Sequence, residues 1–304
     1  MTESTNISPS LPTVAFLGLG VMGFPMAGHL ASAGFPVTVY NRTGKTADDW
    51  LVQYQNGDCA VARTPSLAVR DADIVAMCVG NDDDVRSVVF GDHGALAAMK
   101  AGSLLIDHTT ASEGLAKELA AACHEKEVGC LDAPVSGGQA GAENGALTIM
   151  VGGPLEAFAR GELLFQVYGK KHALMGAHGA GQLTKMVNQI CIAGVLQGLS
   201  EGIHFAQRAG LDVMAVVDVI AQGAAQSWQM ENRAASMNDD QFEFGFAVDW
   251  MRKDLGMALD AGRARDAKMP LTALIDQFYG DVQALGGGRW DTSSLLRRLT
   301  PPES

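Results

Sequence analysis

The fold is decided by a stretch near the N-terminus, VAFLGLGVMGFPMAGHL, residues 14–30. It begins with a short apolar run, Val14–Leu17, continues through a turn with the spacing G-x-G-x-x-G, and opens a helix. In this spacing the first glycine permits a tight turn, the second lets a pyrophosphate approach the backbone, and the third lets the helix pack closely on the strand. Alone, the spacing fits an ordinary glycine-rich turn equally well, but its place between a strand and a helix favours a dinucleotide site. The expected cofactor contacts are Gly18, Leu19, Gly20, Val21, Met22 and Gly23.

The second apolar run, Val37–Tyr40, ends at Asn41-Arg42-Thr43. At this point an NAD site usually offers Asp or Glu to the ribose, whereas an arginine accommodates the 2′-phosphate of NADP. Because no carboxylate stands at 41–43, the sequence favours NADP, with contacts from Asn41, Arg42 and Thr43. A solvated basic turn is the alternative, and it would leave NAD open.

Short apolar runs continue to alternate with helical stretches as far as about Met175. This pattern predicts a largely parallel, doubly wound sheet covered by helices on both faces, the Rossmann-type α/β class. The expected strands are 14–17, 37–40, 74–79, 104–106, 131–135 and 147–151. Beyond them the periodicity is helical only, over 182–209, 213–223, 246–263 and 271–285. We therefore expect a frayed tail over residues 1–11, a nucleotide-binding domain over 12–176 and an all-α domain over 177–304.

Composition excludes several classes of protein. The chain has 22 Lys and Arg against 34 Asp and Glu, a net charge of −12, which disfavours a general attraction to nucleic acid or anionic lipid. No apolar run reaches membrane-spanning length, and Met1-Thr2-Glu3 lacks the basic start of a secretory signal. The five cysteines are odd in number and contain no C-x-x-C, so neither a disulfide framework nor a metal site is expected. We expect buried, reduced thiols in a cytoplasmic protein.

Two segments hold candidate catalytic or substrate-binding groups. Lys185, Asn188 and Gln189 share one face of the expected helix, although a helical lysine is more often a surface charge. The turn Ser136-Gly137-Gly138 follows a strand and suits either the backbone binding of a carboxylate or a flexible connection.

A third segment, Asp107-His108-Thr109-Thr110, ends another strand at the edge where ligands of open α/β sheets bind. Its hydroxyls suit a cofactor contact, but a helix N-cap at Thr109 or Ser112 is the simpler explanation. His108 ranks below Lys185 as a general base, because a single histidine more commonly has a structural role.

Together these segments resemble the β-hydroxyacid dehydrogenase family, which includes 3-hydroxyisobutyrate dehydrogenases and tartronate semialdehyde reductases. The resemblance covers residues 16 to about 262. It rests on four ordered motifs, which are the glycine-rich turn at 18–23, Asp132-Ala133-Pro134-Val135-Ser136-Gly137-Gly138, the G-x-G-x-x-x-K of residues 179–185, and Lys253-Asp254-Leu255.

The resemblance implies an NAD(P)-dependent oxidoreductase that interconverts a small 3-hydroxy acid and its semialdehyde, with Lys185 as catalytic acid and base. A lysine amine serves both directions if burial or a neighbouring cation lowers its pKa from about 10.4 toward neutrality. The implied substrate-binding residues are Ser136, Gly137, Gly138, Asn188, Gln189, Trp228 and Phe246. Further cofactor contacts are Val79, Gly80, Thr110 and Lys253. The α domain is expected to close the cleft and to build a homodimer or homotetramer, and no metal is implied.

The chain departs from the family pattern in four places. Many relatives carry Asn where Gln189 stands, although Gln is seen in the tartronate semialdehyde reductase branch. The usual D-x-S-T stretch contains His108 here, and Gly80 and Phe244 stand where many relatives have Pro. These differences leave the choice of hydroxy acid open.

Three alternatives remain. A non-catalytic dinucleotide-binding sensor or interaction module would be expected to lose the base, and the related imine reductases replace that lysine, whereas Lys185 is present. The 6-phosphogluconate dehydrogenases carry a His-Asn pair after the catalytic lysine and a longer α domain, whereas Asn188-Gln189 stands here.

Overall fold

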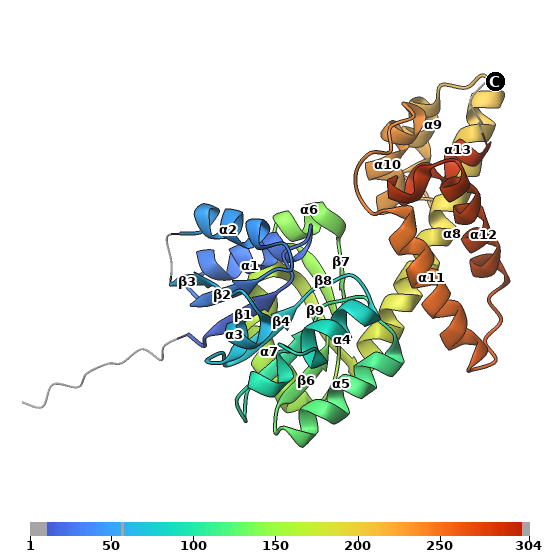
Figure 1. Ribbon diagram of the computed structural model, residues 1–304. Coiled ribbons are helices and arrows are strands. Elements are labelled where there is room, and N and C mark those ends of the chain that lie inside the picture. The colour runs from blue at the N-terminus through green and yellow to red at the C-terminus, as the bar shows by residue number, and fades with distance from the viewer. Residues whose placement is uncertain (1–10, 56–57, 300–304) are drawn as a thin grey trace, which may run out of the picture. The chain divides into compact units, whose positions relative to one another are not determined.

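The computed structural model describes residues 11–55 and 58–299, which form two compact units (Figure 1). Unit 1 extends to Lys185 and unit 2 begins at Met186, inside helix α8 (Ala180–Arg208). The sequence placed a domain boundary earlier, after residue 176, where strand β9 (Gly169–Gly176) ends. Residues 1–10 of the expected tail lie outside the described residues.

Unit 1 is built on one sheet. Its described residues form nine strands in the order β3-β2-β1-β4-β5-β6-β8-β7, with β9 paired to β8. The first six strands are parallel and follow the 3-2-1-4-5-6 order of doubly wound nucleotide-binding folds, whereas β8 runs antiparallel to β6 and β7. The strands are β1 Val14–Leu17, β2 Val37–Tyr40, β3 Cys59–Val61, β4 Ile74–Met77, β5 Leu104–Asp107, β6 Gly129–Asp132, β7 Val135–Ser136 and β8 Leu147–Gly152.

Helices cover both faces of this sheet because successive strand residues point to opposite sides. In β1, Val14 and Phe16 join one core cluster with α1 and α7, whereas Ala15 and Leu17 join another with α3, α4 and α5. The helices of unit 1 before α8 are α1 Gly23–Ser32, α2 Gly44–Gln53, α3 Pro65–Val69, α4 Asp82–Phe90, α5 Glu113–Glu125, α6 Gly138–Glu143 and α7 Leu155–Tyr168, with a 3-10 turn at Leu96–Ala98.

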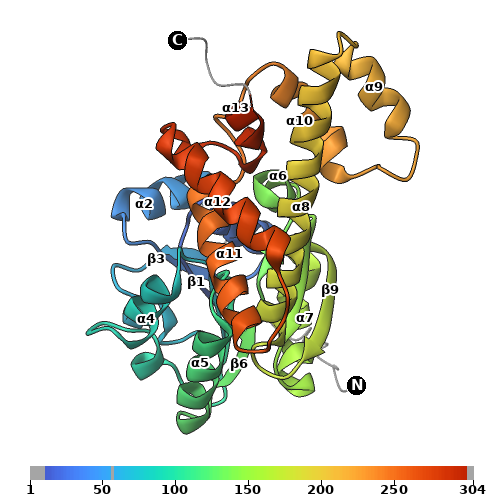
Figure 2. The same cartoon turned by 90° about the vertical axis from the view of Figure 1, so that its right-hand side faces the viewer.

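Unit 2 is helical, as its periodicity predicts. Figure 2 shows α8, α11 and α12 side by side, and Leu196, Met251 and Tyr279 belong to the core cluster that joins them. A second cluster joins the C-terminal half of α8 to α9, α10 and α13. The helices after α8 are α9 Val213–Ile220, α10 Trp228–Asn238, α11 Val248–Arg263, α12 Pro270–Ala284 and α13 Leu295–Leu299, with 3-10 turns at Gly287–Arg289 and Thr292–Ser294.

Several element predictions were wrong. Strands β3 and β9 and helices α10 and α13 were missed, and the expected strand 131–135 is broken into β6 and β7 around Ala133 and Pro134. The thiols also differ from expectation: Cys123 and Cys130 are buried, but Cys191 is exposed. Within the described ranges, no helix combines the length and apolarity needed to span a bilayer.

Candidate active site

The glycine-rich turn after β1 has the shape that its spacing predicts. Gly18 has a φ of +95°, and a Cβ there would overlap the carbonyl oxygen of Cys78. A Cβ on Gly23, the first residue of α1, would overlap the carbonyl oxygen of Gly18. Gly20 is different, because nothing lies within 4 Å of an added Cβ. The first and third glycines therefore serve close packing, and the second faces open space.

The surroundings of this turn fit a dinucleotide. Met22 precedes α1 without a side-chain cap hydrogen bond, and in the first turn Phe24 N donates to Gly20 O (3.0 Å) while Pro25 has no N–H. The positive end of the helix dipole at this N-terminus favours the negative charge of a pyrophosphate. Asn41 Oδ1 accepts a hydrogen bond from Leu19 N (2.9 Å), and Asn41 Nδ2 donates to Thr43 O (3.1 Å). Asn41 thus ties the end of β2 to the glycine-rich turn. Arg42 extends outward, 85% exposed, with Nη1 3.0 Å from Asp84 Oδ1.

The loops after β4 and β5 are joined near the expected cofactor contacts Val79, Gly80 and Thr110. Val79 N donates to Thr109 Oγ1 (3.0 Å), so Thr109 ties the two loops and Thr110 follows it half-buried. Two residues beyond Thr110, Ser112 caps α5 through Leu115 N (3.0 Å), so the N-cap expected at Thr109 or Ser112 is at Ser112.

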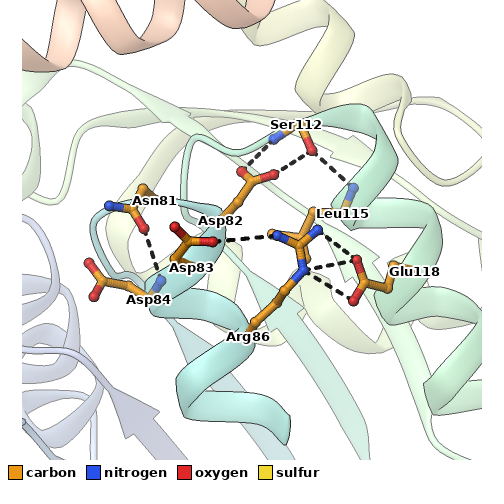
Figure 3. A network of polar contacts seen from close by, with 8 residues as sticks. All are labelled: Asn81, Asp82, Asp83, Asp84, Arg86, Ser112, Leu115 and Glu118. Carbon is orange, nitrogen blue, oxygen red and sulfur yellow. Dashed lines mark hydrogen bonds and ion pairs between the residues drawn. The ribbon is translucent and has the colours of Figure 1, made fainter. Parts of the chain in front are cut away.

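Figure 3 shows how Ser112 extends this link to α4. Its N and Oγ both donate to Asp82 (2.9 and 2.5 Å), and Asn81 caps α4 through Asp84 N (2.9 Å). The loops that follow β4 and β5 are therefore held together at two points, by Thr109 and by Ser112.

His108 is a structural residue. It is 1% exposed, with Nδ1 2.7 Å from Ala133 O and Nε2 2.8 Å from Tyr168 Oη. Since a carbonyl can only accept, Nδ1 carries the proton and Nε2 accepts from Tyr168. Burial lowers the pKa of His108 to about 4, so it stays neutral at ordinary pH. With both nitrogens engaged, it is no candidate base, as its lower rank anticipated.

The N-terminus of the helix that carries Lys185 is fixed by Asp132, the first residue of the Asp132–Gly138 motif. Asp132 Oδ1 accepts from Gly179 N (2.7 Å), and Asp132 Oδ2 accepts from Gln182 N (3.0 Å). Burial raises the pKa of Asp132 above its ordinary value, and these two N–H donors oppose the rise. A carboxylate at this end of a helix is also favoured by the helix dipole.

Three glycines permit this close approach. A Cβ on Gly152 of β8 would lie 2.5 Å from Asp132 Oδ1 and 2.8 Å from Gly181 N. A Cβ on Gly181 would lie 2.6 Å from Asp132 O, and Gly179 has a φ of +92°. Of the two glycines in the G-x-G-x-x-x-K motif, Gly181 is thus explained by the Asp132 contact, whereas Gly179 is explained by its positive φ and by Glu113 Cγ, 2.7 Å from an added Cβ.

Gln182 ties the first turn of α8 to the loop after β5. It is 1% exposed, its Oε1 accepts from Ala111 N (3.0 Å), and its Nε2 donates to Thr109 O (2.7 Å). Lys185 stands three residues further along α8 and is itself 7% exposed. Asp132 and Gln182 therefore fix the turn of α8 from which Lys185 projects.

The turn expected to bind a carboxylate starts at the end of β7. Ser136 is half-buried, and Gly137 and Gly138 are exposed. Their φ values, +136° and +60°, are conformations that glycine adopts without strain. Nothing lies within 4 Å of an added Cβ on Gly138. The backbone of this turn is therefore open to a small ligand.

In unit 2, Gln189 is a bridge between polar side chains. It is 2% exposed, its Oε1 accepts from Asn188 Nδ2 (2.8 Å), and its Nε2 donates to Asp254 Oδ2 (2.7 Å). Lys253 Nζ lies 3.3 Å from Asp254 Oδ1. Asn188, Gln189 and the Lys253-Asp254 pair of α11 thus form one chain of contacts.

The expected pocket residues Trp228 and Phe246 are connected through Asp291. Trp228 is 50% exposed and stacks under the guanidinium of Arg233, which also lies over Phe244. Arg233 Nε is 3.3 Å from Asp291 Oδ1, and Asp291 Oδ2 accepts from Phe246 N (2.9 Å). Phe246 itself packs against the core shared by α8, α11 and α12.

Sequence reasoning missed four buried polar residues that organise these regions. They are Gln182, Asp254, Asp291 and, in its capping role, Asp132. The available signal for Gln182 and Asp254 was their place inside the motifs at 179–185 and 253–255; nothing in the local pattern marked Asp291.

Comparisons with known proteins agree with this arrangement. Residues 13–176 match the family model described as the NAD binding domain of 6-phosphogluconate dehydrogenase. Residues 179–299 match the one described as NAD-binding of NADP-dependent 3-hydroxyisobutyrate dehydrogenase.

Similar proteins extend over nearly the whole chain. An uncharacterized oxidoreductase of Shewanella frigidimarina is 59% identical over 96% of this chain and 99% of its own. The probable 3-hydroxyisobutyrate dehydrogenase-like 1 of Arabidopsis thaliana is 39% identical over 98% and 88%. Among solved structures, 3-hydroxyisobutyrate dehydrogenase of Mycobacterium tuberculosis, with L-serine, matches with a TM-score of 0.85 and 32% identity over 95% and 99%.

The chain belongs to the β-hydroxyacid dehydrogenase family. The expected Rossmann-type α/β class with its helical second part is confirmed, and so is the expected NAD(P)-dependent oxidoreductase. The roles of individual site residues stay predictions.

Proposed function

We propose that this dehydrogenase interconverts a small 3-hydroxy acid and its semialdehyde with NADP as the preferred cofactor, and that Lys185 transfers the proton. The observation that carries the role of Lys185 is its position on α8. It is buried, and the turn before it is held by Asp132 and Gln182. A lysine on a solvated helix face would need neither of these attachments.

Lys185 of unit 1 is proposed to transfer the substrate proton in both directions of the reaction. In the oxidative direction Lys185 Nζ, unprotonated, accepts the proton of the substrate hydroxyl as the carbonyl forms. In the reductive direction the Lys185 ammonium donates that proton to the oxygen as negative charge develops on it. A bound nicotinamide would supply the acceptor for the hydride of the carbinol carbon in oxidation and the hydride donor in reduction.

Binding the acid requires donors for its carboxylate. Ser136 and the turn Gly137-Gly138, which is open at Gly138, supply a hydroxyl and backbone N–H groups for that purpose. In unit 2, the bridge through Gln189 sets the direction of the Asn188 amide, which is suited to a substrate oxygen.

The cofactor is expected to lie on the glycine-rich turn and the loops after β2, β4 and β5. Gly18 to Gly23 take the pyrophosphate, Asn41 to Thr43 the adenosine ribose, and the region of Val79, Gly80 and Thr110 the nicotinamide half. Lys253 of unit 2 is proposed as a further contact of the nicotinamide half of the cofactor. We further propose a cytoplasmic homodimer or homotetramer, in keeping with the sequence expectation.

The test is formation of reduced cofactor by the purified chain. NADP⁺ and NAD⁺ are each paired with 3-hydroxyisobutyrate, glycerate, L-serine and 4-hydroxybutyrate. Turnover of one of the 3-hydroxy acids, abolished by Lys185→Ala without loss of cofactor binding, is expected. Full turnover by Lys185→Ala would reject the assigned base.

The alternative is a non-catalytic dinucleotide-binding module. The buried and fixed position of Lys185 argues against it, because such a module has no need of a positioned base. If none of the four substrates is turned over while the protein still binds the cofactor, the non-catalytic module is favoured.

A further inference from the structure

Two arginines leave the sheet side by side at its carboxyl edge. Strands β2 and β3 are parallel with Val39 opposite Val61, and Ala62 N donates to Val39 O (2.9 Å). Arg42 follows β2 and Arg63 follows β3. Since neighbouring strands lie about 4.8 Å apart, both side chains start from the same corner of the nucleotide-binding edge.

The guanidinium of Arg63 lies over the start of α2. A Cβ added to Gly44 would come within 3.2 Å of Arg63 Nη1. Asp48, one turn into α2, accepts from Arg63 Nη2 (2.8 Å) and Nη1 (3.2 Å). This forked pair holds the arginine beside the 41–44 loop while using two of its five N–H donors. Both side chains are more than half exposed, so the pair is a weak, solvated contact and a stronger acceptor can compete with Asp48 for Arg63.

Arg42 is also paired with a carboxylate, on α4 instead of α2. Its Nη1 is 3.0 Å from Asp84 Oδ1 of α4, and its side chain is 85% exposed. Asn41 holds the loop against the glycine-rich turn through Leu19 N. The residues at 41–44 carry no carboxylate that would repel an anion there.

We propose that Arg63 joins Arg42 in binding the 2′-phosphate of NADP and is a specificity-determining residue of this enzyme. The inference rests on the proposed function, which puts the adenosine ribose at the end of β2. The two guanidinium groups offer forked donors to the phosphate, a geometry that arginine provides and lysine does not. Asp48 and Asp84 keep the two arginines near the loop when no phosphate is bound. NAD lacks the 2′-phosphate and therefore gains nothing from Arg63.

The experiment measures dissociation constants of the full-length chain for NADP⁺ and NAD⁺ by calorimetric titration. Arg63→Ala is expected to weaken NADP⁺ binding about tenfold or more while NAD⁺ binding stays within about twofold. Adenosine 2′,5′-bisphosphate should show the same loss as NADP⁺, and adenosine 5′-phosphate should show none.

Arg86→Ala is the matched control. Arg86 is likewise a partly exposed arginine paired with a carboxylate, Glu118, at 2.7–3.2 Å, but it lies on α4 and its partner lies on α5 (Figure 3). Its replacement should leave both cofactors unaffected.

Equal losses for both cofactors in Arg63→Ala, or no loss for either, would overturn the inference. A wild-type protein that binds NAD⁺ more tightly than NADP⁺ would also overturn it, together with the proposed NADP preference, and would leave the proposed dehydrogenase activity standing. A wild-type protein that binds neither dinucleotide would remove the proposed function itself.

Discussion

The carboxylate of Asp132 accepts the backbone N–H of Gly179 at 2.7 Å, across 47 residues of sequence. Through this bond the end of β6 holds the start of the helix that carries Lys185. Two of the four motifs that resemble the family are thus parts of one structural device. Disturbing the contact between Asp132 and the start of α8 should therefore lower kcat as well as the stability of the protein.

Asp132→Asn tests this directly. An asparagine has one acceptor oxygen and an NH₂ group, so one of the N–H groups of Gly179 and Gln182 would face a donor, at a cost of about 1–3 kcal/mol. We expect kcat to fall at least about tenfold, with the Kd for NADP⁺ unchanged because the glycine-rich turn is untouched. Steady-state kinetics, cofactor titration and thermal unfolding would be measured together.

The control is Asp73→Asn. Asp73 also accepts a backbone N–H, from Thr13 (2.9 Å), but at the amino end of β4. It should lose stability without loss of kcat. If both variants lose stability equally and keep their turnover, Asp132 has no role in positioning Lys185.

Gly152→Ala should act on the same device from β8. Its Cβ would press on both Asp132 oxygens and on Gly181 N, so the start of α8 must shift. Overpacking of this kind costs about 1–3 kcal/mol, and we expect a lower unfolding midpoint and a lower kcat.

Gly114→Ala provides the comparison, because the nearest atom to its added Cβ is Ser112 Oγ at 3.7 Å on an exposed turn of α5. That variant should be neutral or slightly stabilised. A Gly152→Ala protein with wild-type kinetics would show that the contact tolerates the methyl group.

Gln189→Asn introduces the residue that many relatives carry. The shorter side chain cannot reach both Asn188 and Asp254, so the Asn188 amide loses its fixed direction. We expect kcat/KM for the hydroxy acid to fall about tenfold, mainly through KM, since Gln189 itself is buried.

Gln197→Asn makes the same chemical change on α8, where the buried Gln197 donates to Glu201 (2.6 Å). It should leave KM near the wild-type value. Equal KM values for the two variants would assign Gln189 to structure alone.

The fold could largely be predicted from the sequence because most of its strands are continuous apolar runs. Runs such as Ile74–Met77 and Leu104–Asp107 are buried on both faces, so their apolar residues are continuous. Strand β9 was missed because it lies beside β8 with exposed Lys170 and Lys171, a composition typical of an edge. Short, partly exposed β3 gave no signal for the same reason.

The site was readable only where one short segment carries the chemistry. The glycine-rich turn and Lys185 are local patterns, whereas Asp132, Gln182 and Asp291 act on partners 45 or more residues away. Such pairings depend on how strands are ordered in the sheet and on how helices pack. A single sequence does not encode them in any spacing.

The last prediction concerns pH and the buried pair at the end of β5. Burial raises the pKa of Asp107 to about 7 and lowers that of His108 to about 4. Between pH 4 and 6.5 the folded protein therefore holds a proton on Asp107 that the unfolded chain has lost, so this group's contribution to stability falls as pH rises. His108 does the opposite, because the unfolded chain binds a proton there and the folded protein does not. The two slopes nearly cancel.

Asp107→Asn should remove the contribution of Asp107 to the pH dependence of stability and leave the opposite contribution of His108. We expect its free energy of unfolding in urea to rise by about 3 kcal/mol more than that of the wild type between pH 4 and 6.5, from 1.36 kcal/mol per pH unit. Asp92→Asn, at an exposed site, controls for the change in net charge. If the two variants follow the same pH curve, Asp107 is ionised in the folded protein throughout this range, and the hydrogen bond from Thr109 N (2.9 Å) outweighs its burial.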